Sequence, residues 1–587
     1  MKKFEAPPSP FITSINNRDE FNSLINPDLD DEDDQRANTM LKDVLPDNIN
    51  ISTTQQRLLA EQCMLKSSSS SGFQRFQWYT CVFLILGVDC SALINQCMFM
   101  LTMPPDYECQ DNNTMEWKKC GQEYICDPMT HLPFKDVVYR IDPTDPESLD
   151  NWYTTLILEC QSKNVVELFN ISFLIGLVLG TIIFSRVGDL LGRKKTYFIG
   201  LLMHVLLSAT LLILRDPNYF YAIIFLMGIE YPARFLVGYI YLSEMCSEKS
   251  RPIVTSIALF FVAQSVTFAC IYFSLISKHW IWLEIVGLVL TVIALIGAIW
   301  IPESPRFLIA QGKYAKAYRV FQRIAKFNGK KFNKIHFKLT TRRTSEDDEL
   351  EQAVKDPNAW IERNSMTSNQ EEDSQMEKDQ FTEVNISQES EATSNNKMLK
   401  FTDIFLKKQL RTNTIVLLLC WLTYQFSTTM LYRSMSLTVD STFVDYLISA
   451  NSEAFGYIFA AFIYMNRQNG GKRTIAVGFL ASSLISLIFI GFYQQSVAVQ
   501  IFTSIVTFSI AASANCLFLI TFEMYPTSYV SSMFGIFYLS SQLFTLVVPE
   551  ITNNTNLPLP IVIFALINLF TSLIAARFLD EKRRKVI

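Results

Sequence analysis

The chain has 587 residues, of which 49% are hydrophobic and 18% charged, and its formal net charge is −5. Long apolar stretches with almost no charge recur along it, which is typical of a membrane protein and argues against a soluble multidomain enzyme. The negative net charge, without a basic stripe among aromatics, argues against a nucleic-acid binder. We find no nucleophile–base or metal-ligand constellation, so we expect no enzymatic activity, cofactor or metal.

Residues 1–75 are polar and include an acidic run at 28–34. They contain no apolar core of the kind that a signal peptide needs, so we expect a disordered cytosolic tail. Apolar segments long enough to cross a bilayer as helices follow. We place them at 76–101, 165–185, 196–214, 219–242, 253–276, 281–301, 412–432, 443–465, 474–493, 497–520, 531–549 and 558–579.

These segments predict an all-α membrane protein with twelve transmembrane helices in two groups of six, at 76–301 and 412–579. Between them lies a polar insert, 302–411, in which 312–327 has the period of an amphipathic helix. Segment 346–391 holds 15 acidic and three basic residues, so we expect 340–398 to be disordered. Residues 580–587 form a basic tail.

Basic residues gather in the short loops after the second, fourth and eighth segments, whereas the alternate loops are poor in them. The positive-inside rule then places both termini and the insert in the cytosol. The protein should be a multi-pass integral membrane protein, with the plasma membrane favoured and an endomembrane left open.

The loop at 102–164 then faces the outside. Four cysteines in such a loop predict two disulfides, with three pairings open, and a glycosylation sequon begins at Asn112. The cysteines are Cys109, Cys120, Cys126 and Cys160.

Two groups of six around an insert resemble the major facilitator superfamily, and several local motifs agree. The sequence SRVGDLLGRKK at 185–195 resembles that family's motif between its second and third helices, in which an acid and bases hold the two halves together. The gating residues that the resemblance implies are Asp189, Gly192, Arg193 and Lys194, the looser second-half counterparts Arg467 and Arg473, and Glu244, Arg251, Glu303, Arg306 and Glu523.

The chain further resembles the organic cation, carnitine and organic anion transporter family. The resemblance rests on the long cysteine-bearing loop, its entry Pro104-Pro105-Asp106-Tyr107-Glu108-Cys109 and its exit Leu158-Glu159-Cys160. The motif Pro302-Glu303-Ser304-Pro305-Arg306 is shared with sugar porters. Val530 stands where the family has an arginine.

Ionisable groups inside spanning helices are functional candidates because burying them is expensive. Glu453 is the leading candidate for substrate contact, since its surroundings resemble a family motif that ends at the position of Tyr457. Glu230 and Arg234, spaced i, i+4, could equally form a self-neutralising pair. Gln542 occupies the position that selects substrate charge in the family. The other candidates are Asp89, Phe268, Tyr272 and Tyr424.

The acids leave the predicted cavity negative, so we expect transport of a small organic cation or a zwitterion resembling carnitine, by alternating access. The expected partners are this substrate and the lipid bilayer, without nucleic acid, and the coupling ion is left open. The alternatives are a sugar-porter-like carrier, an organic anion carrier, and a non-transporting receptor or scaffold that uses the fold.

Overall fold

The computed structural model describes most of the helical part of the chain. The described residues are 53–68, 73–89, 93, 96–110, 116–127, 134, 137–145, 147–161, 163–332, 408–435, 442–467, 469–492, 496–548, 551 and 559–580. The disordered segments predicted at 340–398 and in most of 1–75, the basic tail and Asn112 lie outside this range.

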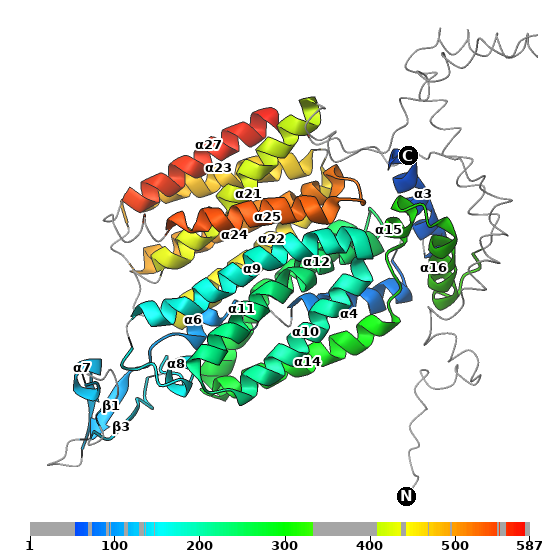
Figure 1. Cartoon of the computed structure of the whole chain (residues 1–587). Coiled ribbons are helices and arrows are strands. Elements are labelled where there is room, and N and C mark those ends of the chain that lie inside the picture. Colours follow the sequence, from blue (N-terminus) through cyan, green and yellow to red (C-terminus); the bar gives the residue numbers. More distant parts are fainter. Residues whose placement is uncertain are drawn as a thin grey trace, which may run out of the picture.

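Long helices run roughly alongside one another and form the body of the molecule (Figure 1). Those of the first part of the chain are α4 (Arg75–Asp89), α9 (Lys163–Leu191), α10 (Arg193–Ile213), α11 (Pro217–Arg234), α12 (Leu236–Met245), α13 (Arg251–Ile271) with the π-helix η1 (Tyr272–Ile276), and α14 (Trp280–Trp300). Those of the second are α21 (Lys408–Met435), α22 (Thr442–Asn466), α23 (Gly470–Phe489), α24 (Ser496–Met524), α25 (Val530–Thr545) and α27 (Leu559–Phe578).

Among the described residues, nine helices are long and apolar enough to cross a membrane. Three predicted spans fall outside this set: α4 and α25 are only 15 and 16 residues long, and α22 carries Asp445 and Glu453. The prediction of one helix over 76–101 was wrong, because a turn at 96–97 precedes a separate short helix, α6 (Met98–Leu101), and α4 is described only as far as Asp89.

Close helix packing depends on small residues at the contacts. A Cβ added at Gly176 or Gly180 of α9 would lie 2.0 Å from a backbone oxygen of α11, so only glycine permits this approach. Pro232 lies inside α11, where it cannot donate the helical hydrogen bond to the preceding turn. A single turn residue, Phe235, separates α11 from α12, which begins at Leu236. The first and second parts of the chain meet where α13 packs against α22 and α9 against α25.

The segment between α4 and α9 adds a small sheet that the all-α prediction did not include. Its strands β1 (Tyr107–Gln110), β2 (Trp117–Cys120) and β3 (Tyr139–Ile141) are antiparallel in the order β2-β1-β3. Disulfides join Cys109 to Cys120 and Cys126 to Cys160, which decides among the three pairings. The sheet lies at one end of the helical body, called here the sheet end (Figure 1).

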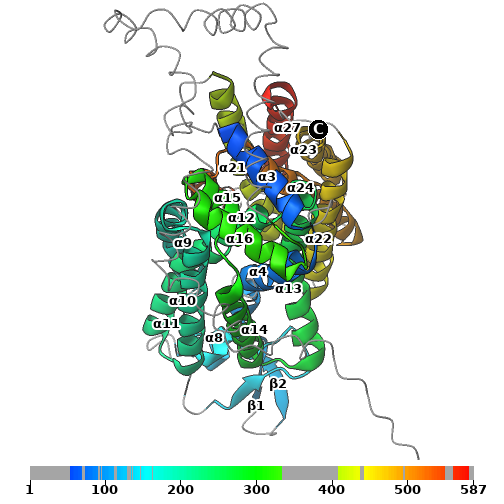
Figure 2. The ribbon, with the colours of Figure 1, turned by 90° about the vertical axis from the view of Figure 1, so that its right-hand side faces the viewer.

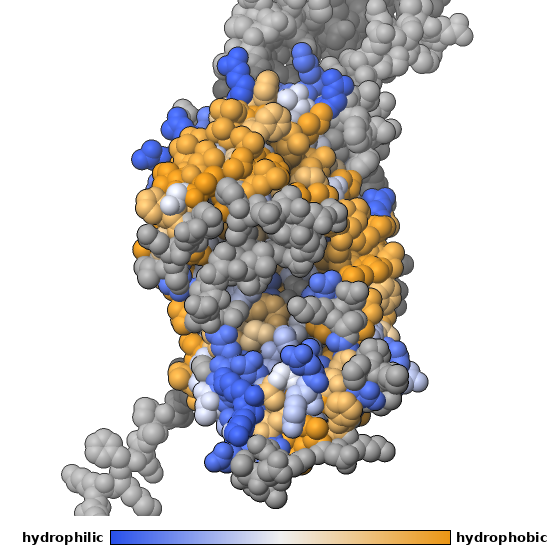
Figure 3. All heavy atoms as spheres, turned by 90° about the vertical axis from the view of Figure 1, so that its left-hand side faces the viewer, coloured by the Kyte–Doolittle hydropathy of each residue, from blue (hydrophilic) through white to orange (hydrophobic). Residues whose placement is uncertain are grey.

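Buried aromatic residues hold this segment against the helices. Trp152 of α8 (Trp152–Thr155) packs edge-on against Phe220 of α11 and Trp280 of α14, with ring centroids 5.1 and 6.2 Å apart. A further short helix, α7 (Gln122–Ile125), follows β2. Seen from this end, hydrophobic residues cover much of the upper part of the view and hydrophilic ones gather in the lower part (Figure 3).

The opposite end carries three helices that cross the ends of the long ones: α3 (Thr53–Ser67), α15 (Pro305–Ala310) and α16 (Tyr314–Phe327) (Figure 2). We call it the α3 end. Residues 53–67 were predicted to belong to a disordered tail, and this was wrong. Leu59, Cys63 and Met64 of α3 are buried against the main hydrophobic core, so tertiary packing stabilises a helix that its polar composition did not indicate.

Candidate functional site

Glu453 lies near the middle of α22 and lines a small cavity. The hydroxyl of Tyr457, one turn further along the helix, donates a hydrogen bond to its carboxylate at 2.7 Å, and Tyr424 of α21 contacts Tyr457. The sequence-predicted residues Glu453, Tyr457 and Tyr424 are therefore brought together. The cavity is lined by Tyr424, Thr428, Leu431, Ser449, Glu453, Thr507, Ile510 and Ala511.

Aromatic side chains fill the space between the two parts of the chain. The rings of Tyr231 and Phe235 stack with their centroids 5.3 Å apart, and the ring centroid of Phe235 lies 6.2 Å from that of Tyr538 of α25. Tyr538 in turn contacts the side chain of the predicted residue Gln542. Sequence reasoning missed Tyr231, Phe235 and Tyr538, and the only available signal was the density of aromatics in these helices. Their π faces can bind a cation.

Three other predicted residues are not placed in this cavity. Phe268 is 42% exposed and lines an apolar groove between α4 and α13. Tyr272 is buried, and its hydroxyl donates to the backbone carbonyl of His279 at 2.7 Å, at the sheet end. Asp89 ends α4, and its side chain lies outside the described residues. The period of a helix does not reveal which way each aromatic faces, so sequence alone could not separate Phe268 from a cavity residue.

Glu230 and Arg234 form the intrahelical pair that their spacing allowed. The guanidinium donates to both carboxylate oxygens at 2.5 Å, and the imidazole Nδ1 of His204 on α10 lies 3.0 Å from Glu230 and 3.1 Å from Arg234. All three side chains are buried. This arrangement favours mutual neutralisation over direct substrate contact, and His204 is a neighbour that the sequence prediction missed.

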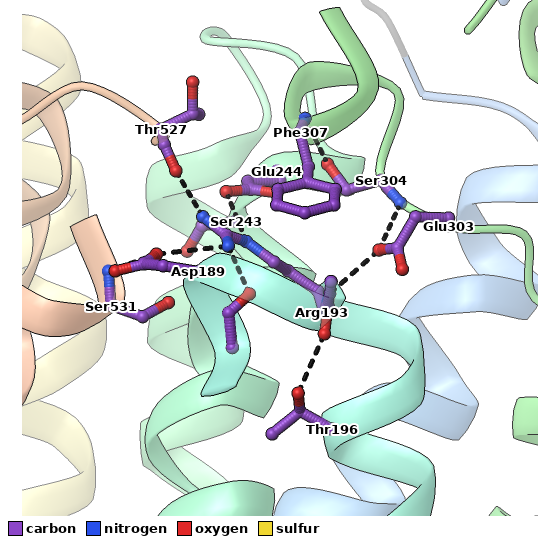
Figure 4. Close-up of polar contacts among 12 residues, drawn as sticks. Asp189, Arg193, Thr196, Ser243, Glu244, Glu303, Ser304, Phe307, Thr527 and Ser531 are labelled. Carbon is purple, nitrogen blue, oxygen red and sulfur yellow. Dashed lines mark hydrogen bonds and ion pairs between the residues drawn. The ribbon is translucent and has the colours of Figure 1, made fainter. Parts of the chain in front are cut away.

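The motif at 185–195 forms a buried ion-pair cluster at the α3 end (Figure 4). Arg193 lies 3.1 Å from both Asp189 and Glu244, and it also donates to the backbone carbonyl of Thr527 at 2.5 Å. The Asp189 carboxylate accepts the backbone N–H of Ser532 at 2.7 Å. Both contacts connect α9 and α10 to the start of α25 and the turn before it. Asp189 and Arg193 of this motif therefore form a buried ion pair.

Glu303 binds the start of α10. Its carboxylate accepts the backbone N–H groups of Arg193 and Lys194 at 2.9 and 3.1 Å, where the helix dipole favours negative charge. Gly192 has a φ of +107°, and a Cβ there would lie 2.2 Å from the Glu303 carboxylate. Glycine is needed at this position both for the backbone and for the close approach.

A second set of contacts surrounds Glu523 at the end of α24. Arg251 lies 3.6 Å from its carboxylate and Tyr464 donates to it at 2.8 Å. Arg306 instead binds Glu61 of α3 at 2.6 Å. The predicted counterparts Arg467 and Arg473 are exposed, so they do not join a buried cluster as Arg193 does.

Comparison with known proteins agrees with this architecture. The sequence pattern of the Major Facilitator Superfamily matches residues 153–549, more than half of the chain. Among solved structures, the xylose transporter XylE from E. coli superposes with a TM-score of 0.52 at 11% identity, covering 87% of this chain and 99% of XylE. A second structure, titled the proton:xylose symporter XylE bound to 6-bromo-6-deoxy-D-glucose, gives a TM-score of 0.55 at 11% identity, covering 86% of this chain and 96% of that one. At this identity the likeness shows the fold alone.

The chain belongs to the Major Facilitator Superfamily and is a multi-pass membrane protein. It is a divergent member related to the organic cation and organic anion transporters, which are not enzymes. It is 31% identical to human Solute carrier family 22 member 2 over 183 residues, 30% of this chain and 32% of that protein. The match to mouse Organic anion transporter 3 is 23% identical over 536 residues, 87% of this chain and 90% of that protein. The chain thus matches about a third of the length of the Solute carrier family 22 member 2 proteins.

Proposed function

We propose that this protein carries small organic cations or zwitterions across a membrane by alternating access. The observation that supports this most is Glu453, an acidic side chain in a cavity otherwise lined by neutral residues and bordered by tyrosines. A carboxylate attracts a cation, and aromatic faces add an attraction of about 0.5–2 kcal/mol each. Among the residues that line the cavity Glu453 alone is charged, so it sets the sign of the charge at this site.

The proposed architecture has twelve spans in two bundles. The first contains α4, α9, α10, α11 with α12, α13 and α14, and the second contains α21, α22, α23, α24, α25 and α27. Rocking of one bundle against the other would use the contacts of α13 with α22 and of α9 with α25. The basic loops support a cytosolic α3 end, with the termini and the insert 302–411 on the same side and the sheet end outside. The disulfides of the outside segment favour the plasma membrane.

The cluster around Arg193 is proposed to close the cytosolic end. Its contacts cross between the two bundles, because Arg193 and Asp189 belong to the first whereas Thr527, Ser531 and Ser532 belong to the second. At the outside end, the backbone N–H of Phe443 donates to Glu147 at 3.2 Å and the rings of Phe99 and Tyr446 lie 3.9 Å apart. Opening either end would require breaking one of these sets.

Uptake into proteoliposomes tests the proposal. We would load the full-length chain into lipid vesicles and measure a labelled tetraalkylammonium cation and a labelled aromatic carboxylate in parallel. Cation uptake above that of empty vesicles is expected, with at least a tenfold loss in Glu453→Gln because the pairing of a desolvated charge is worth more than 1.4 kcal/mol. Glu167→Gln, which changes an exposed glutamate on α9, serves as the matched control.

Each other outcome overturns part of the proposal. Uptake of the carboxylate alone would favour an organic anion carrier, a reading that the long match to Organic anion transporter 3 makes worth testing. Cation uptake that is unchanged in Glu453→Gln would remove Glu453 from the site. Flux no higher than in empty vesicles, in a correctly folded preparation, would favour a receptor or scaffold.

A further inference from the structure

A chain of polar side chains crosses the interior of the first group of helices, away from Glu453. Glu284 of α14 is only 5% exposed, and its carboxylate lies beside the hydroxyl of Ser208 on α10, the helix against which α14 packs. The same hydroxyl lies 3.3 Å from Nε2 of His204, one turn earlier on α10. The other ring nitrogen of His204 contacts the Glu230–Arg234 pair. Hydrogen-bond contacts therefore run from Ser208 through His204 to Glu230 and Arg234, and Glu284 lies beside the Ser208 end of this row.

The charges in this chain do not balance without a proton. Glu230 and Arg234 neutralise each other, which leaves the Glu284 carboxylate without a cation of its own. One of its oxygens, Oε1, has no hydrogen-bond partner among the described residues. A buried carboxylate in this condition is unfavourable by several kcal/mol, and one bound proton makes the whole group neutral.

Other ionisable groups on the packed helices are engaged elsewhere. α14 packs against α10 and α4, and α10 packs against α11. Tyr197 of α10 donates to the carbonyl of Leu84, and Tyr79 of α4 donates to that of Gly297. The side chain of Asp89 lies outside the described residues. At the start of α14, His279 binds Asp150 at 2.6 Å. Among the described side chains, the ionisable groups along this row beside Glu284 are thus His204, Glu230 and Arg234, of which Glu230 and Arg234 carry a charge.

We infer that Glu284, Ser208 and His204 form a site that binds one exchangeable proton. In the protonated form, the Glu284 O–H donates to the Ser208 hydroxyl, Ser208 donates to Nε2 of His204, and Nδ1–H donates to Glu230. In the deprotonated form the first two bonds reverse and the third changes its partner. His204 carries its hydrogen on Nε2 and donates it to Ser208, Ser208 donates to the Glu284 carboxylate, and Nδ1 accepts from Arg234. Between the two forms the chain gains or loses one proton to solvent.

Binding of the proton would therefore change the partner of Nδ1 from Arg234 to Glu230. Both residues lie on α11 beside Tyr231 and Phe235, which reach the second group of helices through Tyr538. Proton binding would thus change the hydrogen bonds of α11 next to the aromatic contacts between the two parts of the chain. The inference concerns proton binding and holds whether or not the protein transports a cation.

Infrared spectroscopy of the full chain in lipid nanodiscs tests the bound proton. A protonated carboxyl C=O band should appear as the pH is lowered and should move to lower frequency in D₂O. It should be lost in Glu284→Gln and retained in Glu167→Gln, which changes an exposed glutamate. A carboxyl signal that does not depend on pH, or one that Glu284→Gln leaves whole, would overturn the site.

Nitrogen NMR of labelled histidine tests the relay, and the spectrum is simple because the chain has four histidines. The His204 signal, assigned by its loss in His204→Gln, should change from the Nε2–H to the Nδ1–H tautomer as the pH falls. Ser208→Ala removes the connecting hydroxyl and should abolish this change while the carboxyl band remains, which provides a second variant if Glu284→Gln folds poorly. One tautomer at every pH in the unmodified protein would refute the relay.

Discussion

Arg57 of α3 donates hydrogen bonds to the backbone carbonyl of Glu523 at 2.7 Å and to that of Tyr525 at 2.5 Å. From the next turn of the same helix, Glu61 binds Arg306 and accepts the backbone N–H of Glu248 at 3.0 Å. α3 therefore links the end of α24 to the segments that follow α12 and α14, as its position across the helix ends shows (Figure 2). Burial, followed by the nearby charge of Arg306, lowers the pKa of Arg57 to about 10.

Removing this link should loosen the α3 end. We expect Arg57→Ala to lower the free energy of unfolding by about 1.5–3 kcal/mol, since hydrogen bonds from a charged donor are lost. Thermal unfolding of the purified protein measures this. Lys66→Ala, an exposed position on the same helix, should change the free energy by less than about 0.5 kcal/mol. Equal effects of the two substitutions would refute the role of Arg57.

Asp189→Asn should weaken the cluster around Arg193. The substitution keeps the shape of the side chain but removes one of the two carboxylate charges that Arg193 contacts, while the pair with Glu244 remains. Loss of an interaction with a charged group costs about 1.5–3 kcal/mol. The expected result is a lower unfolding temperature. Glu116→Gln, which affects an exposed pair with Lys118, should have little effect. A normal unfolding temperature in Asp189→Asn would show that the cluster does not stabilise the fold.

The packing of α9 on α11 should not tolerate a side chain at Gly180. Its added Cβ would lie 2.0 Å from the carbonyl oxygen of Ile229, so Gly180→Leu must force the two backbones apart. Overpacking of this kind costs about 1–3 kcal/mol or more. Gly491→Ala is the control, because the added Cβ would meet its nearest neighbour at an ordinary 3.6 Å. Comparison of folded yield and unfolding temperature would test the difference.

The two disulfides should contribute unequally to stability. Cys126–Cys160 closes a segment of 34 residues and Cys109–Cys120 one of 11. In the chain-entropy description the longer loop is worth about 1 kcal/mol more. The paired Cys→Ser variant that lacks Cys126–Cys160 should therefore unfold at a lower temperature than the one that lacks Cys109–Cys120. The reverse order would mean that contacts other than the loop closure dominate at the sheet.

Acid should destabilise the sheet through Asp142. The hydroxyl and backbone N–H of Thr144 donate to its carboxylate at 2.6 and 2.8 Å, and together with Lys119 they lower its pKa. A pKa lowered in the folded state adds stability above the unfolded value of about 3.9, and this stability is lost as the pH falls through the folded value.

Thr144→Val removes one donor and should move the acid transition to higher pH. The fluorescence of Trp117 on β2, obtained as the difference from a Trp117→Phe variant, would follow the transition. Because the backbone N–H of Thr144 remains, the shift should be partial. A transition that stays at the same pH would show that the hydroxyl does not hold Asp142 in its charged form.

Local patterns in the sequence determined the helical class, the position of most spans and the motif at 185–195. Hydropathy and charge patterns extend over one or a few helical turns, so they can be recognised in the sequence without knowing which segments pack together. The same patterns failed where neighbours decide the outcome. α3 is polar by composition yet folds because Leu59, Cys63 and Met64 meet a core supplied by distant segments.

The candidate sites divide in the same way. The sequence selected Glu453 and Tyr457 because of a motif and the expense of burying charge, whereas Tyr424 was one of several aromatic candidates. Tertiary structure alone decided that Phe268 faces a groove, that Arg193 reaches Thr527, and that Glu284 meets His204 through Ser208. Such contacts depend on how each helix is rotated about its own axis. Hydropathy leaves that rotation open, and the packing of neighbouring helices fixes it.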